Sequence, residues 1–116
     1  AIASSSPYDI IYKMLSVNNI TSYFDVIVSR NDVQAKKPSP DIYYEALKRL
    51  ELSPHDCIVI EDSSVGIQAA VNAGLNVIAL KENRFSVDQS KANWIVNDLI
   101  EAWIKISEVF NLVCSD

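Results

Sequence analysis

The chain has 116 residues, of which 49% are hydrophobic and 22% charged, and its formal net charge is −5. This length fits one domain, and the apolar fraction is typical of a folded globular protein rather than a disordered chain. Because the sequence holds no basic cluster and no apolar run of membrane-spanning length, we expect neither a nucleic-acid partner nor a membrane partner.

The first part of the chain indicates a strand, a helix and a second strand. Residues 1–3 look like the end of a strand. Ser6 is the expected N-cap of the first helix, with Pro7 at its first position and Asp9 completing a capping box. The run FDVIVS at 24–29 predicts the second strand. The expected apolar face of the helix consists of Tyr8, Ile11, Met14 and Leu15.

The middle of the chain predicts a second helix, a buried strand and a short third helix. The sequence Ser-Pro-Asp at 39–41 repeats the chemistry of the first helix start. The continuous apolar run CIVI at 57–60 indicates a strand buried on both faces of a parallel sheet. Ser63 or Ser64 then starts the short helix, and Gly74 is suited to end it. The expected apolar face of the second helix consists of Ile42, Tyr43, Ala46, Leu47 and Leu50.

The last part of the chain predicts strands at 76–80 and 94–96 and a helix over about 98–110. The expected apolar stripe of this helix consists of Leu99, Trp103, Ile106 and Phe110. Strands and helices thus alternate along the chain, which is typical of an α/β protein with right-handed crossovers. We expect a Rossmann-like parallel sheet with flanking helices.

Cysteine usage favours a reducing compartment. Cys57 lies in an apolar strand and Cys114 near the end of the chain, and their spacing suggests neither a disulfide scaffold nor a zinc site. We therefore expect a cytoplasmic protein. The single histidine, His55, lies in a turn and is given no role.

Serines and a lysine fall where ligands bind in open α/β sheets, at the carboxyl ends of strands. Ser4, Ser5 and Ser6 follow the first strand, and Lys37 lies in the loop after the second. Hydroxyls, helix-start amides and an ammonium group suit the oxygens of a phosphate. Taken singly, each has a structural alternative, because such serines usually form a cap and a turn, and such a lysine is usually solvated.

The adjacent acids Glu61 and Asp62 are a stronger signal. Two like charges at the end of a buried strand repel unless a cation compensates them, and one or two carboxylates with waters and a substrate phosphate commonly hold Mg²⁺. The alternative is a plain helix start, where carboxylates favour the helix dipole. Gly66, which costs about 1 kcal/mol relative to Ala in a helix, indicates close packing or a tight turn. Together the residues predict a Mg²⁺-dependent phosphate site.

These motifs resemble the haloacid dehalogenase superfamily of phosphohydrolases, most closely its capped, β-phosphoglucomutase-like subgroup. AIASSSP resembles the second family motif, which implies phosphate-binding hydroxyls at Ser4 and Ser5. KKPSPDIYYEAL resembles the third, which implies that Lys37 pairs with the phosphate and the nucleophile. VIEDSSVGIQAAVNAG resembles the fourth, which implies Asp62 as a Mg²⁺ ligand, with Glu61 supporting the metal directly or through water.

The resemblance implies that residues 1–116 are the C-terminal portion of the family's core domain. The first family motif, Asp-x-Asp on a central strand, supplies the nucleophile, and this sequence holds neither that motif nor the helical cap. We therefore expect an incomplete sheet and no turnover by this chain alone, with a truncated or cleaved enzyme as the leading explanation. The strands that end at Ala3 and Ile60 could pair directly, or receive a strand from the missing segment or another chain.

For the intact enzyme, the resemblance implies an aspartyl-phosphate mechanism in which Mg²⁺ and the lysine neutralise charge. The implied substrate is a small phosphorylated metabolite, with sugar phosphates favoured. Tyr8 stands where the β-phosphoglucomutases are expected to have Asn, which favours a phosphatase over a mutase. The alternative is a naturally truncated, catalytically dead phosphate-binding or protein-interaction module.

Overall fold

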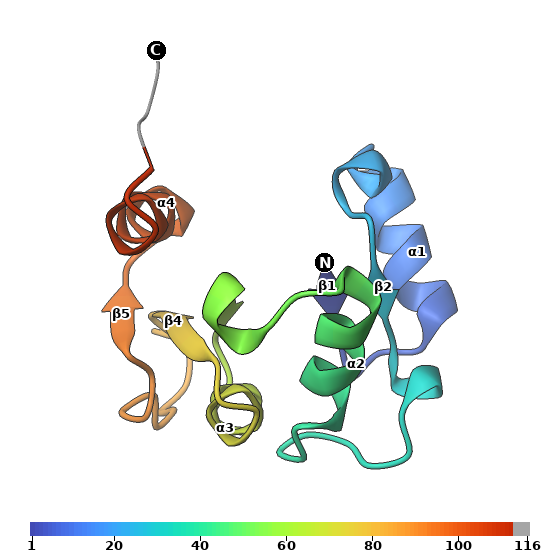
Figure 1. Cartoon of the computed structure of the whole chain (residues 1–116), viewed down its shortest axis with the longest axis horizontal. Coiled ribbons are helices and arrows are strands. Elements are labelled where there is room, and N and C mark those ends of the chain that lie inside the picture. The colour runs from blue at the N-terminus through green and yellow to red at the C-terminus, as the bar shows by residue number, and fades with distance from the viewer. Residues whose placement is uncertain (113–116) are drawn as a thin grey trace.

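The computed structural model describes residues 1–112, which form strands and helices in the predicted α/β alternation (Figure 1). The strands are β1 (Ile2–Ala3), β2 (Ile27–Val28), β3 (Ile58–Glu61), β4 (Asn76–Leu80) and β5 (Trp94–Val96). The helices are α1 (Tyr8–Val17), α2 (Asp41–Leu50), α3 (Ser64–Asn72) and α4 (Leu99–Val109), with single 3₁₀ turns at Thr21–Tyr23, Arg30–Asp32 and Pro54–Asp56. The expectation for Cys114 lies outside the described residues.

The five strands are divided between two parallel sheets with flanking helices. One sheet is β1-β2 and the other β3-β4-β5. Figure 1 shows α3 and α4 on opposite faces of the three-stranded sheet, while α2 packs against β1 and β2 with α1 beyond them. Within the described residues β1 does not pair with β3, so the sheet is interrupted there and the direct pairing considered above does not occur.

Helices α2 and α3 join the two sheets through a common core. Ile42 of α2, Ile67 of α3 and Val77 of β4 are almost completely buried in it. A smaller cluster on the other face of the three-stranded sheet lies beneath α4, around Ile78 and Ala102. The core thus runs continuously only on the α2–α3 side. None of the helices described in the structure is both long enough and apolar enough to span a membrane.

The start of α1 differs from the prediction. Pro7, not Ser6, is the N-cap, and the first N–H of the helix, that of Tyr8, donates to Asn31 Oδ1 at 3.0 Å. The Ser6 N–H instead donates to Ser4 Oγ at 3.1 Å, so the serines form a turn. Ile11 and Leu15 are buried as expected, but Tyr8 and Met14 are exposed, because a helix that covers only a two-stranded sheet buries a narrow stripe.

Two predicted strands are also less extensive than expected. The run 24–29 contributes only Ile27–Val28, because a 3₁₀ turn precedes it and Ser29 opens a capping box at Arg30–Asp32. The prediction that the strand at 57–60 is buried on both faces is wrong, since Ile60 of β3 is 41% exposed. Its edge toward β1 has no paired strand to cover it.

The predicted stripe of α4 is also wrong in part. Ala102 is fully buried and Ile106 packs against the same cluster, whereas Leu99 and Trp103 are 63% and 49% exposed. Leu99 and Trp103 lie toward one side of the line through Ala102 and Ile106. The apolar surface of α4 is therefore wider than the sheet beneath it covers.

Candidate functional site

Lys37 connects the carboxyl ends of the two sheets. Its ammonium donates to Glu61 Oε2, after β3, at 2.9 Å and to the Ala3 carbonyl, at the end of β1, at 3.3 Å. The two side chains are only 9% and 14% exposed. The structure thus brings together Lys37, Glu61 and the start of the serine turn, as the sequence led us to expect.

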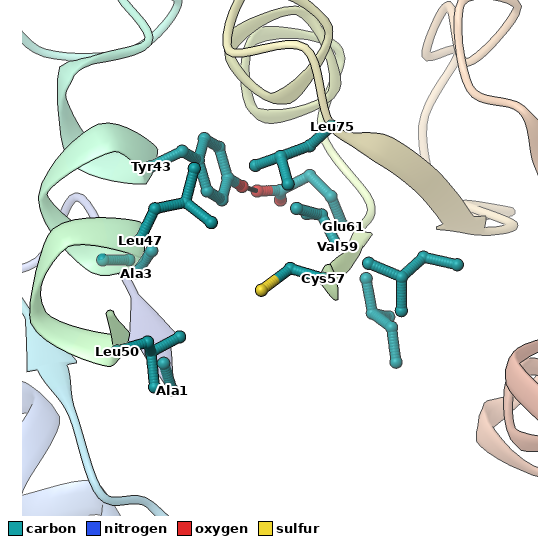
Figure 2. A pocket seen from close by; sticks show the side chains of 12 residues that line it. Ala1, Ala3, Tyr43, Leu47, Leu50, Cys57, Val59, Glu61 and Leu75 are labelled. Carbon is teal, nitrogen blue, oxygen red and sulfur yellow. Dashed lines mark hydrogen bonds between the residues drawn. The ribbon is translucent and has the colours of Figure 1, made fainter. Parts of the chain in front are cut away.

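Tyr43 completes this ion pair from α2. Its buried hydroxyl donates to Glu61 Oε2 at 3.0 Å, and Figure 2 shows the ring directed at that carboxylate. The Lys37 ammonium lies 5.3 Å from the centre of the Tyr43 ring, within the range of a cation–π interaction. The sequence assigned Tyr43 only to an apolar face, although a buried tyrosine hydroxyl generally requires a hydrogen-bond partner.

The other oxygen of Glu61 is also engaged. Oε1 accepts from the Asp62 N–H at 3.2 Å and from the Ser63 hydroxyl at 3.5 Å. Burial, the largest single influence, raises the pKa of Glu61, but the charge of Lys37 and the donated hydrogen bonds together hold that pKa below its ordinary 4.5. The same arrangement raises the pKa of Tyr43, through burial first and then the charge and hydrogen bond of Glu61. Glu61 is therefore ionised and Tyr43 neutral near pH 7.

Gly66 makes room for the Glu61 carboxylate. A Cβ at this position would overlap Glu61 Cδ and Oε2 and would lie 2.6 Å from Cγ. The Gly66 N–H meanwhile donates to the N-cap hydroxyl of Ser63 at 3.0 Å, which fixes the first turn of α3 against the acid. Of the two explanations that the sequence left open, close packing is the one observed.

Asp62 differs from its neighbour. It is exposed, and its carboxylate makes no hydrogen bond or ion pair with another described residue. Its carbonyl accepts a 2.8 Å hydrogen bond from Gln89, which also donates to the Leu80 carbonyl at 2.7 Å. Gln89 is buried although the sequence placed it in a polar loop, where no local pattern distinguishes it. Gln89 thus fastens the end of β3 to the end of β4.

These donors are an incomplete set for Mg²⁺. Over residues 1–112, no three His, Cys, Asp or Glu side chains are grouped closely enough to hold a metal ion. Both Glu61 oxygens accept hydrogen bonds from protein groups, so Asp62 provides the more accessible carboxylate. The repulsion between the two acids is relieved here by Lys37 on one side and by solvent on the other.

A groove separates β1 from β3 on the amino-terminal side of this ion pair. It encloses about 280 Å³, and Figure 2 shows Glu61 and Tyr43 at one end and apolar side chains along both walls. Those walls are formed by Ala1, Ala3, Leu47 and Leu50 on one side and by Cys57, Val59 and Leu75 on the other. The groove therefore follows the line along which the sheet is interrupted.

Residues 1–80 match the family model described as haloacid dehalogenase-like hydrolase. The chain belongs to this family. The haloacid dehalogenase-like chain is 54% identical to a bifunctional riboflavin kinase/FMN phosphatase of Arabidopsis thaliana over 57 residues, 49% of this chain and 15% of that protein. It is 38% identical to a phosphorylated carbohydrates phosphatase of Thermotoga maritima over 78 residues, 67% of this chain and 36% of that protein.

The fold of this haloacid dehalogenase-like chain also matches solved members of the predicted subgroup. The crystal structure of β-phosphoglucomutase from Clostridium difficile aligns with a TM-score of 0.75 and 29% identity, over 85% of this chain and 44% of that one. These comparisons confirm the predicted family, its β-phosphoglucomutase-like relatives and the α/β fold class. The chain spans less than half the length of each of these three proteins.

Proposed function

We propose that this chain supplies the phosphate-binding part of a phosphatase for small phosphorylated metabolites, sugar phosphates among them. The observation that carries the proposal is the buried Lys37 ammonium, held against Glu61 and beside the turn that contains Ser4. A cation fixed by protein groups stabilises the charge of a phosphoryl group without reorganisation during the reaction. Ser4 and Ser5 add hydroxyl donors beside it. The phosphatase names of two relatives support the same reaction class.

We assign different roles to the two acids. Asp62, exposed at the end of β3, is the residue proposed to bind Mg²⁺, and Glu61 orients Lys37. Bound Mg²⁺ would neutralise phosphate charge. Its remaining protein ligands would have to come from outside the described residues, which provide no group of three candidate ligands.

The nucleophile is proposed to come from another segment. No Asp-x-Asp occurs in this sequence, so an aspartyl-phosphate would form on a carboxylate carried elsewhere in the protein. The groove between β1 and β3 is suited to an extended strand, because the facing edges of both strands are unpaired and the walls are apolar. A strand in it would end beside Lys37 and Asp62. We propose that the missing N-terminal segment fills this groove, with a second copy of the chain as the alternative, and that residues 1–116 alone are inactive.

A phosphatase assay on the protein that carries this chain tests the proposal. Release of phosphate from fructose 1-phosphate should require added Mg²⁺, and Lys37→Met should lower kcat/KM by about 100-fold or more, as loss of an electrostatic stabiliser does. The control Lys13→Met removes an exposed lysine of α1 and should change little. Phosphate binding without hydrolysis of any sugar phosphate would instead support the catalytically dead module. Turnover by residues 1–116 alone would refute the external nucleophile.

A further inference from the structure

A second and larger cleft, of about 820 Å³, opens at the carboxyl ends of β1 and β2. Three stretches that are separate in the sequence form its walls: Ser5 after β1, Arg30 after β2, and residues 33–37. Ile42 of α2 and Val65 of α3 complete the lining. This cleft therefore begins where the proposed phosphate-binding serines end, on the side away from the groove between the sheets.

The cleft is strongly cationic in an acidic chain. Arg30, Lys36 and Lys37 line it, and no acidic side chain does, although the formal net charge of the whole chain is −5. Lys37 is neutralised by Glu61. Within residues 1–112, neither Arg30 nor Lys36 forms an ion pair with an acid. Two positive charges thus stand uncompensated in one concave surface, where the surrounding protein concentrates their field.

Both cations are held close to the proposed phosphate site by the backbone. The Arg30 N–H donates to the Ser6 carbonyl at 3.1 Å, which ties the start of its 3₁₀ turn to the serine turn. Lys36 directly precedes Lys37, and its carbonyl accepts from the Ser39 N–H at 3.0 Å. A ligand with its phosphate at Ser4 and Lys37 would therefore extend into the reach of both side chains.

We infer that this cleft binds a second anionic group of the substrate through Arg30 and Lys36. The preferred ligand is then a small phosphate ester that also carries a carboxylate or a second phosphate. Arginine pairs with such planar or tetrahedral anions through two parallel N–H donors, and lysine adds a point charge. The inference rests on the proposed function, because that function places the first phosphate.

The test compares two ligands that differ in one anionic group. Glycerol 3-phosphate and 3-phosphoglycerate share a three-carbon chain and a phosphate, but only the second has a carboxylate. Calorimetry on the protein that carries this chain should show about tenfold tighter binding of 3-phosphoglycerate, which two exposed charge pairs allow. The double variant Arg30→Gln/Lys36→Gln should abolish this preference and leave the affinity for glycerol 3-phosphate within about twofold.

The matched control is Lys13→Gln/Lys48→Gln, which removes the same charge from exposed positions outside the cleft and should retain the preference. Equal binding of the two ligands, binding of neither, or a preference that survives in the double variant overturns the inference. Hydrolysis is measured in the same samples. Selective binding that depends on Arg30 and Lys36, together with no hydrolysis of these ligands or of fructose 1-phosphate once Mg²⁺ is added, would refute the proposed function and leave the anion-binding cleft standing.

Discussion

Replacing Gly66 with Ala should destabilise the protein although Ala is the better helix former. The new methyl group would overlap the Glu61 carboxyl group, whose oxygens are held by Lys37, Tyr43 and the Asp62 N–H. Because carbon atoms pack at about 3.5–4.0 Å, Glu61 must retreat by roughly 1 Å or more. Overpacking of this kind costs about 1–3 kcal/mol, and helix propensity returns about 1 kcal/mol.

Misplacing one partner of a buried ion pair adds to that loss, because breaking such a pair costs about 3–5 kcal/mol. With partial retention of the Lys37 contact, we expect Gly66→Ala to lower the free energy of unfolding by about 2–3 kcal/mol. Urea denaturation measures this directly, and the m-value should not change.

The matched background is Glu61→Ala, which removes the atoms that the methyl group would meet. There, Gly66→Ala should raise the free energy of unfolding by about 0.5–1 kcal/mol, the usual gain in helix propensity. The sign of the effect should thus reverse between the two backgrounds. A neutral or stabilising Gly66→Ala with Glu61 intact would show that the carboxylate does not occupy this space, and the assigned role of Gly66 would fail.

Two further predictions concern the same ion pair. Tyr43→Phe should lower the free energy of unfolding by about 1.5–3 kcal/mol, because it removes a buried hydrogen bond to a charged group. The control Tyr44→Phe removes an exposed 3.3 Å hydrogen bond to a carbonyl and should lower it by under about 0.5 kcal/mol. Similar losses for the two variants in urea titrations would contradict the buried role of Tyr43. The pKa of Glu61 in the folded protein lies below its ordinary 4.5. The ionised carboxylate therefore contributes its full stabilisation of the fold above pH 4.5, and this stabilisation is lost as the pH falls through the lowered pKa. Stability should therefore fall more steeply below pH 4.5 in the unmodified protein than in Glu61→Gln, and parallel pH profiles would refute this.

The proximity of Lys37 and Glu61 was predictable from the sequence, whereas the other side chains that contact these residues were not. Lys37 and Glu61 follow strands that are consecutive along the chain, and parallel strands place their carboxyl ends on one side of the molecule, so their proximity followed from the α/β pattern. Tyr43 and Gln89 were not predicted as site residues, because their roles depend on which polar atoms fold against them. A tyrosine on an apolar helix face and a glutamine in a polar loop have no local pattern that identifies a buried partner.

The sequence by itself determined the α/β alternation and the family, because hydrophobic periodicity, helix starts and the three motifs are local features of the chain. Only the tertiary structure decided what those residues do to one another. It paired Lys37 with Glu61 and left Asp62 exposed, and it gathered Arg30 and Lys36 into one cleft although the sequence contains no basic cluster. The interaction energy of two charges depends on the distance between them and on their burial, and both are set only when the chain folds.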